Sequence, residues 1–192
     1  MVLRSKDIRC VGGECYAHVF ENPRMGVKRG LFWNFILECA PISWDGEECE
    51  ASLLCDWVTL PTRNWPDLGE VGLGDLPQRD LLEASFYLSA HHDVKLSRLE
   101  IAYEREDLFR VHLGGNFDLE GYDDLDGVAI PIDTSGSVRF KGLIVMPDNV
   151  FPKPSGEADA VSVAREFLDL ENFAAPAWDG SRFLFEPRPA AA

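Results

Sequence analysis

Hydrophobic and polar residues alternate along two consecutive segments of the chain, residues 31 to 39 and 49 to 57. Because neighbouring side chains of a strand point to opposite faces, this period of two predicts two strands that each bury one face. A three-residue loop at residues 44 to 46, Trp-Asp-Gly, would pair Trp33 with Trp57 and keep both apolar sets on one face, whereas a two-residue loop would not. The same register pairs Phe35 with Cys55 and Leu37 with Leu53.

The alternation recurs downstream and predicts further hairpins. Three more strands follow from it: residues 82 to 88, 99 to 103 and 109 to 113. The charged turn EREDL joins the last two of these into a hairpin. In VAIPIDTSGSVRFKGLIVMP, a loop at residues 134 to 136 would place Ile132 opposite Val138. Pro131 would then lie in an edge strand, because proline has no N–H to donate to a neighbouring strand.

One segment has helical periodicity, from about residue 157 to residue 170. Its apolar residues recur at spacings of three and four, and acidic residues occupy its first turn. A turn and a short closing strand follow in WDGSRFLFEP. These elements predict a mainly β protein, an antiparallel β-sandwich or curled sheet built from hairpins, with one C-terminal helix packed on it; an α+β arrangement is the alternative.

The length and composition are those of one folded domain. The chain has 192 residues, of which 46% are hydrophobic and 27% charged, and this is ordinary for a globular protein that buries one core. We expect a β-rich domain over residues 1 to 186 and a frayed tail over residues 187 to 192. Residues 61 to 80 are rich in proline and glycine and predict a long loop.

The cysteines and the N-terminus bear on the cellular compartment. The five cysteines include no pair at CxxC spacing, and an odd count does not complete a disulfide framework. In CVGGEC a two-residue turn would place Cys10 opposite Cys15, but two reduced cysteines are the favoured interpretation. The basic N-terminus has no apolar run behind it and no segment reaches the length of a membrane span, so we expect a cytoplasmic protein.

The formal net charge is −15 and is unevenly distributed. Residues 1 to 48 contain six Lys or Arg and seven Asp or Glu, so about −14 falls on the other residues. Residues 100 to 133 contain ten acidic residues and two basic ones. Such a negative field repels phosphate backbones, which argues against direct binding to nucleic acid or to an anionic membrane, and it attracts basic proteins.

The segment GYDDLDG, residues 121 to 127, partly matches a calcium-binding loop. It places Asp124, Asp126 and Asp133 at the third, fifth and twelfth positions of that loop. Tyr122 takes the first ligand position, however, and the following residues predict a strand rather than a helix. A solvated acidic turn or a loop that faces a partner is therefore the favoured interpretation.

Other candidate chemistry is weak. His91, His92 and Asp93 are adjacent, but successive strand residues point to opposite faces, so they are only weak metal-binding candidates. The GxSxG motif is absent, and neither Ser135 nor Ser155 has an identifiable base. We expect no cofactor and no catalytic residue, and a binding protein rather than an enzyme.

We predict an acidic binding protein that neutralises a basic protein partner, for example one that handles nucleic acids. In its composition, though in no specific motif, the chain resembles bacterial immunity proteins and phage-encoded inhibitors. The predicted contact residues are Glu104, Glu106, Asp107, Asp118, Glu120, Asp123, Asp124, Asp126, Trp44 and Trp65. The tryptophans are included because aromatic residues in exposed loops are typical interface anchors, although they could equally cap the sheet.

Two other function classes remain open at this stage. One is a small-molecule-binding or metal-dependent hydrolytic β-domain that uses His91, His92 and nearby acids around a pocket. The other is a structural subunit of a larger assembly. The sequence does not distinguish the oligomeric states.

Overall fold

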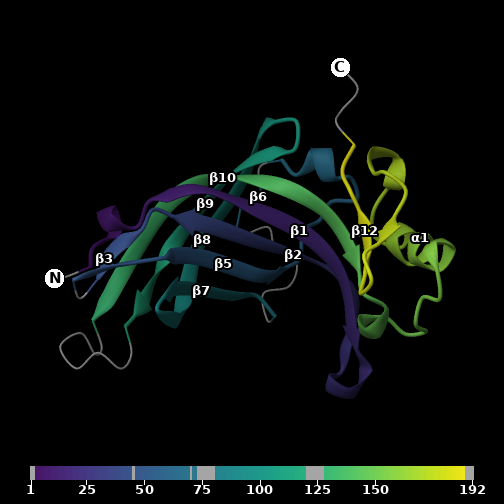
Figure 1. The fold of residues 1–192 in the computed structure, drawn as a ribbon, viewed down its shortest axis with the longest axis horizontal. Helices are drawn as coiled ribbons and strands as arrows, with labels where there is room; N and C mark the ends of the chain where they lie inside the picture. Colours follow the sequence, from purple (N-terminus) through teal and green to yellow (C-terminus); the bar gives the residue numbers. More distant parts are fainter. Residues whose placement is uncertain (1–2, 45, 70, 73–80, 120–127, 189–192) are drawn as a thin grey trace.

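The computed structural model of the protein describes residues 3–44, 46–69, 71–72, 81–119 and 128–188. Seven long strands of one sheet close into a β-barrel (Figure 1). In their order around the barrel they are β1 (Cys10–Asn22), β2 (Val27–Cys39), β5 (Ala51–Val58), β7 (Glu83–Leu88), β8 (Ala90–Arg105), β9 (Leu108–Asp118) and β10 (Ala129–Val145), which returns to β1.

The shorter elements extend or cover this barrel. They are β3 (Ile42–Trp44), β4 (Glu47–Cys49), β6 (Val71–Gly72), β11 (Ala177–Trp178), β12 (Phe183–Phe185), the helix α1 (Glu157–Arg165) and 3₁₀ turns at Ser5–Asp7, Pro23–Met25, Trp65–Asp67, Pro147–Asn149 and Leu170–Asn172. Strand β6 pairs with β8, and β12 with β10 and β11. Among the described residues, no helix has both the length and the apolar character needed to cross a bilayer.

The mainly β class with one C-terminal helix is confirmed, but the sheet forms a barrel and not a sandwich. The curled-sheet alternative is nearer, because the curl continues until β10 meets β1. Large side chains from the strands fill the interior of the barrel. The largest fully buried ones include Trp33, Phe35, Phe86, Phe109, Phe117 and Phe140.

The predicted register of the first two strands is confirmed over most of their length. Phe35 lies opposite Cys55, and Leu37 opposite Leu53. A bulge then inserts one extra residue into β5, so that Trp33 faces Val58 instead of Trp57. Trp57 adopts a positive φ of 60° and leaves the core face. The prediction that Trp57 belongs to the barrel core is therefore wrong, because alternation does not reveal a bulge.

The tip of this hairpin also differs from the prediction. Strands β3 and β4 form a small separate ladder in which Trp44 lies opposite Glu47, so two residues and not three connect them. Asp45, one of these two, lies outside the described residues. The ladder of β3 and β4 has a different register from the ladder of β2 and β5. The change occurs at Ala40, Pro41 and Glu50, which lie outside these four strands.

The predicted hairpin around residues 134 to 136 is wrong, because β10 runs through these residues without turning. Thr134 and Gly136 are buried like the apolar residues on either side. A Cβ atom on Gly136 would lie 2.9 Å from the Cβ of Cys10, so glycine here serves the close approach of β1 to β10 and not a turn. Pro131 does lie on an edge, since this part of β10 pairs with β9 alone.

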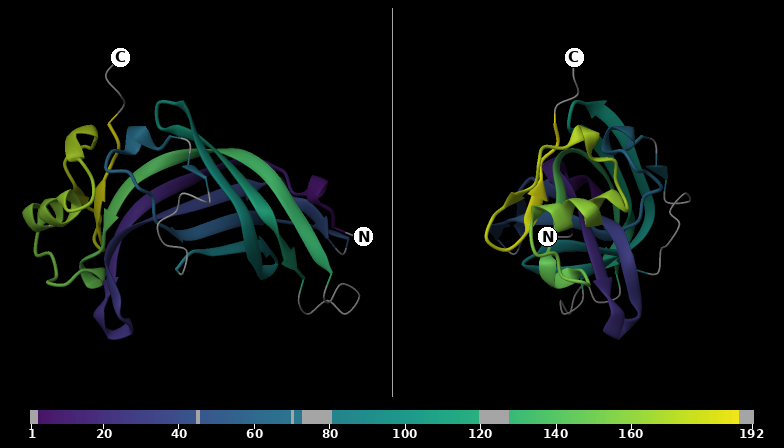
Figure 2. Two further views of the ribbon diagram at one scale, coloured as in Figure 1. Left: turned by 180° about the vertical axis from the view of Figure 1, so that it is seen from behind. Right: turned by 90° about the vertical axis from the view of Figure 1, so that its right-hand side faces the viewer.

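A C-terminal lobe of α1, β11 and β12 covers one end of the barrel, remote from the N-terminus (Figures 1 and 2). Ala160, Val163 and Ala164 of α1 join the barrel core. The helix ends at Arg165, not near residue 170, because the Arg63 guanidinium donates to the carbonyl oxygens of Arg165 and Glu166, at 3.1 and 3.0 Å.

The end of the chain is held to the lobe as far as the structure describes it. The backbone N–H of Arg188 donates to Asn172 O at 2.8 Å, and Pro187 forms an isolated bridge with Phe173. These first two residues of the predicted tail thus contact the C-terminal lobe, and residues 189 to 192 lie outside the described residues.

Gly142 allows β10 to leave β9 and pair with β12, and its substitution should destabilise the protein. Its φ is 119°, and a Cβ atom would overlap the carbonyl oxygen of Phe185. We expect Gly142→Ala to lower the free energy of unfolding by about 2–4 kcal/mol, because backbone atoms cannot move aside as a side chain can. Gly12→Ala is the control, since no atom lies within 4 Å of its Cβ position. Urea denaturation measures both; equal stabilities would contradict this role of Gly142.

Candidate functional site

Two of the predicted acidic contact residues are engaged by neighbouring side chains. The Glu104 carboxylate accepts hydrogen bonds from Ser137 Oγ at 2.6 Å and from Arg110 Nη2 at 3.2 Å. The hydrogen bond from Ser137 is the main reason that the pKa of Glu104 is lowered. Asp107 pairs with Arg139 Nη1 at 2.6 Å. Each of these ion pairs offsets one negative charge on the outer face of β8, β9 and β10.

The same outer face carries one further ion pair and a contact between a histidine and a carboxylate. Arg98 Nη2 lies 2.9 Å from Glu100 Oε2. His112 Nε2 lies 2.6 Å from Asp133 Oδ1, so the one of the three calcium-loop aspartates that the structure describes already contacts a histidine. Of the other predicted contact residues, Glu106 is exposed in the turn after β8 and Asp118 is half-buried. Glu120, Asp123, Asp124 and Asp126 lie outside the described residues.

Trp44 and Trp65 are buried, so neither offers an exposed anchor to a partner. Only 8% of Trp44 and 1% of Trp65 are exposed. Trp65 closes one end of the barrel: its ring centroid lies 5.2 Å from that of Phe140, and its Nε1 donates to Asn172 O at 2.9 Å. The burial of both side chains is compatible with the alternative expectation, that they cap the sheet.

The structure separates the three candidate metal ligands of β8. His92 is buried against Phe117 inside the barrel, while His91 and Asp93 are exposed on the outer face. This arrangement follows from the geometry of a regular strand, in which successive side chains point to opposite faces of the sheet. Within the part of the chain that the structure describes, no three His, Cys, Asp or Glu side chains are grouped so as to hold a metal ion.

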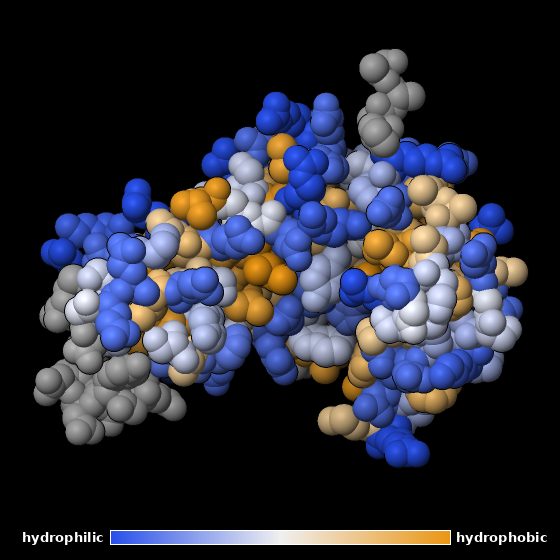
Figure 3. Space-filling view, in the orientation of Figure 1, coloured by the Kyte–Doolittle hydropathy of each residue, from blue (hydrophilic) through white to orange (hydrophobic). Residues whose placement is uncertain are grey.

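An aromatic cluster on the outer face of β1, β2 and β5 was not predicted from the sequence. We call Tyr16, His18, Phe20, Phe32 and Trp57 the outer aromatic cluster. Trp57 is at its centre, with ring centroids 5.1 Å from His18, 4.9 Å from Phe20 and 5.4 Å from Phe32. Figure 3 shows apolar side chains in the middle of the view and a hollow at its lower edge.

A hydrogen-bonded network fixes the polar groups of this cluster. The backbone N–H of Trp57 donates to Asn34 Oδ1 at 3.2 Å, so the amide nitrogen of Asn34 faces His18 Nδ1, 3.0 Å away. Since that amide group can only donate, His18 Nδ1 accepts and the neutral ring carries its proton on Nε2. Burial lowers the pKa of His18 to about 4, consistent with a neutral imidazole.

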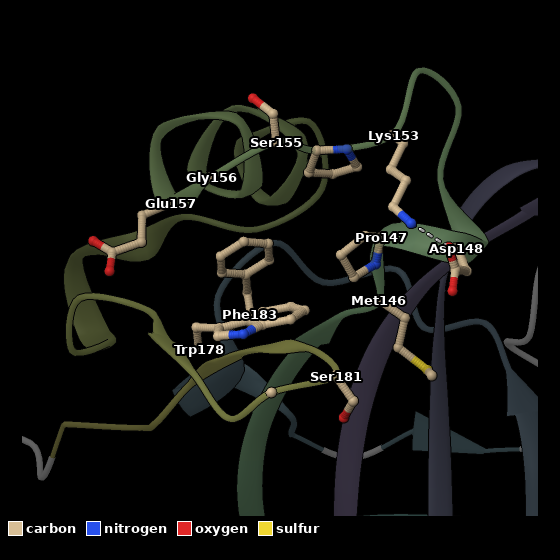
Figure 4. Close-up of a pocket in the computed structure, with 12 residues that line it drawn as sticks. Met146, Pro147, Asp148, Lys153, Ser155, Gly156, Glu157, Trp178, Ser181 and Phe183 are labelled. Atoms are coloured by element: carbon tan, nitrogen blue, oxygen red, sulfur yellow. Dashed lines mark hydrogen bonds and ion pairs between the residues drawn. The ribbon is translucent and has the colours of Figure 1, made fainter.

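An open groove lies at the C-terminal lobe, between the segment that follows β10 and the β11–β12 turn (Figure 4). We call it the C-terminal groove; its volume is about 1230 Å³ and its lining residues are Met146, Pro147, Asp148, Lys153, Pro154, Ser155, Gly156, Glu157, Trp178, Gly180, Ser181 and Phe183. Trp178 is 49% exposed, and its ring centroid lies 4.8 Å from that of Phe183. Figure 4 shows these two rings next to each other, with Pro147 beside them.

The charged side chains of the C-terminal groove are mostly acidic. The lining contains two acids, Asp148 and Glu157, and one base, Lys153, so it carries one net negative charge. Lys153 Nζ lies 2.6 Å from Asp148 Oδ1. Two acids flank the groove. Asp159 accepts hydrogen bonds from the Ser155 backbone and hydroxyl, and Asp179 pairs with Arg182 at 2.8 Å. The hydrogen bonds from Ser155 lower the pKa of Asp159, and those from Ser181 and Arg182 lower the pKa of Asp179, so both stay ionised.

The two serine side chains that line the groove are engaged in hydrogen bonds. The hydroxyls of Ser155 and Ser181 both donate to carboxylates, and no histidine or cysteine is among the described lining residues. A serine nucleophile needs a base that can take its proton near neutral pH, and an ionised aspartate of low pKa is a poor one.

The chain was compared with known proteins in three ways. No family model, no curated protein and no solved structure matches it.

The lowered pKa of His18 predicts a loss of stability in acid. An unfolded histidine titrates near pH 6.5 and the folded one near pH 4, so the unfolded state takes up the proton first as the pH falls through this window. His18→Gln removes the titration and keeps a neutral side chain that can accept the Asn34 hydrogen bond. Between pH 7 and pH 4.5, we expect the wild type to lose about 2 kcal/mol more unfolding free energy than this variant in urea titrations. Parallel losses in the two proteins would refute the assignment.

Proposed function

We propose that the protein is a binding protein whose C-terminal groove takes an extended, basic segment of a partner protein. The observation that carries the proposal is the exposed Trp178 ring, which packs on Phe183 in an open groove with a net acidic lining. An aromatic face attracts the cation of Arg or Lys, and carboxylates at the groove's edge add charge complementarity.

The lining of the groove supports an extended occupant. The groove is open to solvent, and proline rings and the Trp178 and Phe183 side chains make up much of its apolar lining. Grooves lined by aromatic residues are a recurring means of holding an extended peptide, because the rigid rings lose little conformational entropy on binding.

The charge of the whole chain supports a basic partner. A net charge of −15 raises the rate at which a cationic protein meets this one, whichever residues make the final contacts. The acids between residues 104 and 126 contribute to this long-range field in the proposal, while the close contacts are assigned to the C-terminal groove. A partner that uses the same basic segment to hold nucleic acid would be inhibited by the complex, as expected for an inhibitor of the immunity-protein kind.

The C-terminal groove can be tested with labelled peptides in place of the unknown partner. A fluorescein-labelled peptide of alternating Arg and Pro residues should bind in anisotropy titrations, and a Glu-Pro peptide of equal length should not. Trp178→Ala should weaken binding at least about tenfold, because an exposed aromatic anchor that also contacts a cation is lost. A rise in ionic strength should weaken it further.

Tyr103→Ala is the matched control, because Tyr103 is a similarly exposed aromatic residue, 53% accessible, that does not line the groove. It should bind the Arg-Pro peptide like the wild type. Equal affinity of the Trp178→Ala variant and the wild type, or equal binding of the Arg-Pro and Glu-Pro peptides, would refute the proposal.

A further inference from the structure

Two of the five free cysteines face one another across neighbouring strands. Cys10 of β1 lies directly opposite Cys39 of β2, and their sulfur atoms are 3.9 Å apart. The two residues belong to the end of the barrel where β1 begins, away from the C-terminal lobe (Figures 1 and 2). Cys15, which the sequence suggested as the partner of Cys10, follows it along the same strand and is fully buried.

The backbone around this pair has the geometry that a disulfide requires. Ala40 N donates to Arg9 O at 2.8 Å, so the hydrogen bond between the strands flanks Cys10 and Cys39 instead of joining them. The Cys10 N–H contacts Thr134 Oγ1 at 3.5 Å and not its neighbour across the ladder. Cys10 and Cys39 are therefore a non-hydrogen-bonded pair, the kind with the shorter Cα separation, about 4.5 Å, which lies within the range of disulfides.

We propose that Cys10 and Cys39 form an oxidisable dithiol site, which a small disulfide such as glutathione disulfide converts into an intramolecular disulfide. Rotation about the Cα–Cβ bonds of the two residues must shorten the sulfur separation from 3.9 Å to about 2.05 Å for the bond to form. The other cysteines are not placed for this reaction. Cys15 and Cys55 are fully buried, and Cys49 has Ser89 Oγ as its neighbour, at 3.7 Å.

The reaction consists of two exchange steps. The Cys10 thiolate, on the more accessible of the two residues, attacks a sulfur of glutathione disulfide and releases one glutathione thiolate. The Cys39 thiolate then attacks the Cys10 sulfur and releases the second glutathione. One protein S–S bond forms while the glutathione S–S bond breaks, and the protons of both protein thiols end on two glutathione thiols. The protein dithiol is oxidised by two electrons, and the glutathione disulfide is reduced by two.

The thiol pKa values favour this order of attack. The hydrogen bond with Cys39 lowers the pKa of Cys10, whereas that bond and burial raise the pKa of Cys39. Cys10 is therefore the first to be present as the thiolate, and the thiolate is the attacking species. Once Cys10 is in the mixed disulfide, Cys39 is the neighbouring thiol that can resolve it.

Titration of the reduced protein in glutathione buffers tests the site. In buffers rich in glutathione disulfide, we expect two of the five thiols to become unreactive toward Ellman's reagent after denaturation. The intact mass should fall by two hydrogens with no glutathione adduct, and peptide mapping should identify a Cys10–Cys39 link. The melting temperature should rise by about 5 °C or more relative to the same protein in dithiothreitol, because the link constrains the unfolded chain.

Three serine variants distinguish the roles of the thiols. Cys39→Ser should stop at the mixed disulfide, with one glutathione bound to Cys10, and Cys10→Ser should stay reduced. Cys49→Ser, the control at another partly exposed cysteine, should form the link like the wild type. A wild-type protein that stays fully reduced, or a link that includes Cys49, would overturn the proposal. The wild-type peptide map decides the matter even if a variant does not fold.

Discussion

The parallel pairing of β10 with β1 is the constraint on which the rest of the structure depends. A closed sheet whose neighbours are all antiparallel needs an even number of strands, so a barrel of seven must contain a parallel pair. Six neighbour pairs here are antiparallel and this one is parallel. Strand β10 must therefore pass from β9 to β1 without reversing, which requires its 17 residues, close approach at Gly136 and a change of direction at Gly142.

The sequence predicts the pairing of strands that are adjacent in the chain well, and the closure of the barrel poorly. Alternation and turn chemistry identify the β8–β9 hairpin, where Leu99 lies opposite Leu113 and Ile101 opposite Val111 as expected. They fail at residues 134 to 136, because a three-residue loop keeps the same residues on one face as a continuous strand does. The pattern is thus identical for both structures, and contacts distant in the sequence favour the strand: residues 134 to 136 pair with His112 and its neighbours in β9, and Gly136 approaches Cys10 of β1.

The candidate sites escaped prediction for related reasons. The outer aromatic cluster depends on the bulge at Trp57, which turns a core position outward, and on β2 bearing aromatic residues on both of its faces, Phe32 outside and Trp33 and Phe35 inside. The C-terminal groove joins two segments about thirty residues apart, and Trp178 becomes exposed only because β11 ends the sheet. Trp44 and Trp65 show the converse: a tryptophan in a segment that the sequence predicts as a loop can be buried in the folded chain.

The packed interior determines how far the two ends of the barrel can influence one another. Phe86, Phe109 and Phe117 are fully buried in the interior between the two ends of the barrel. A close-packed protein interior has low compressibility, so it does not deform continuously. A disulfide between β1 and β2 would stiffen the end that holds Cys10 while the core keeps the C-terminal groove in place. Any coupling between thiol oxidation and partner binding must therefore pass along β1, β2 or β10, the strands that extend from one end of the barrel to the other (Figure 1).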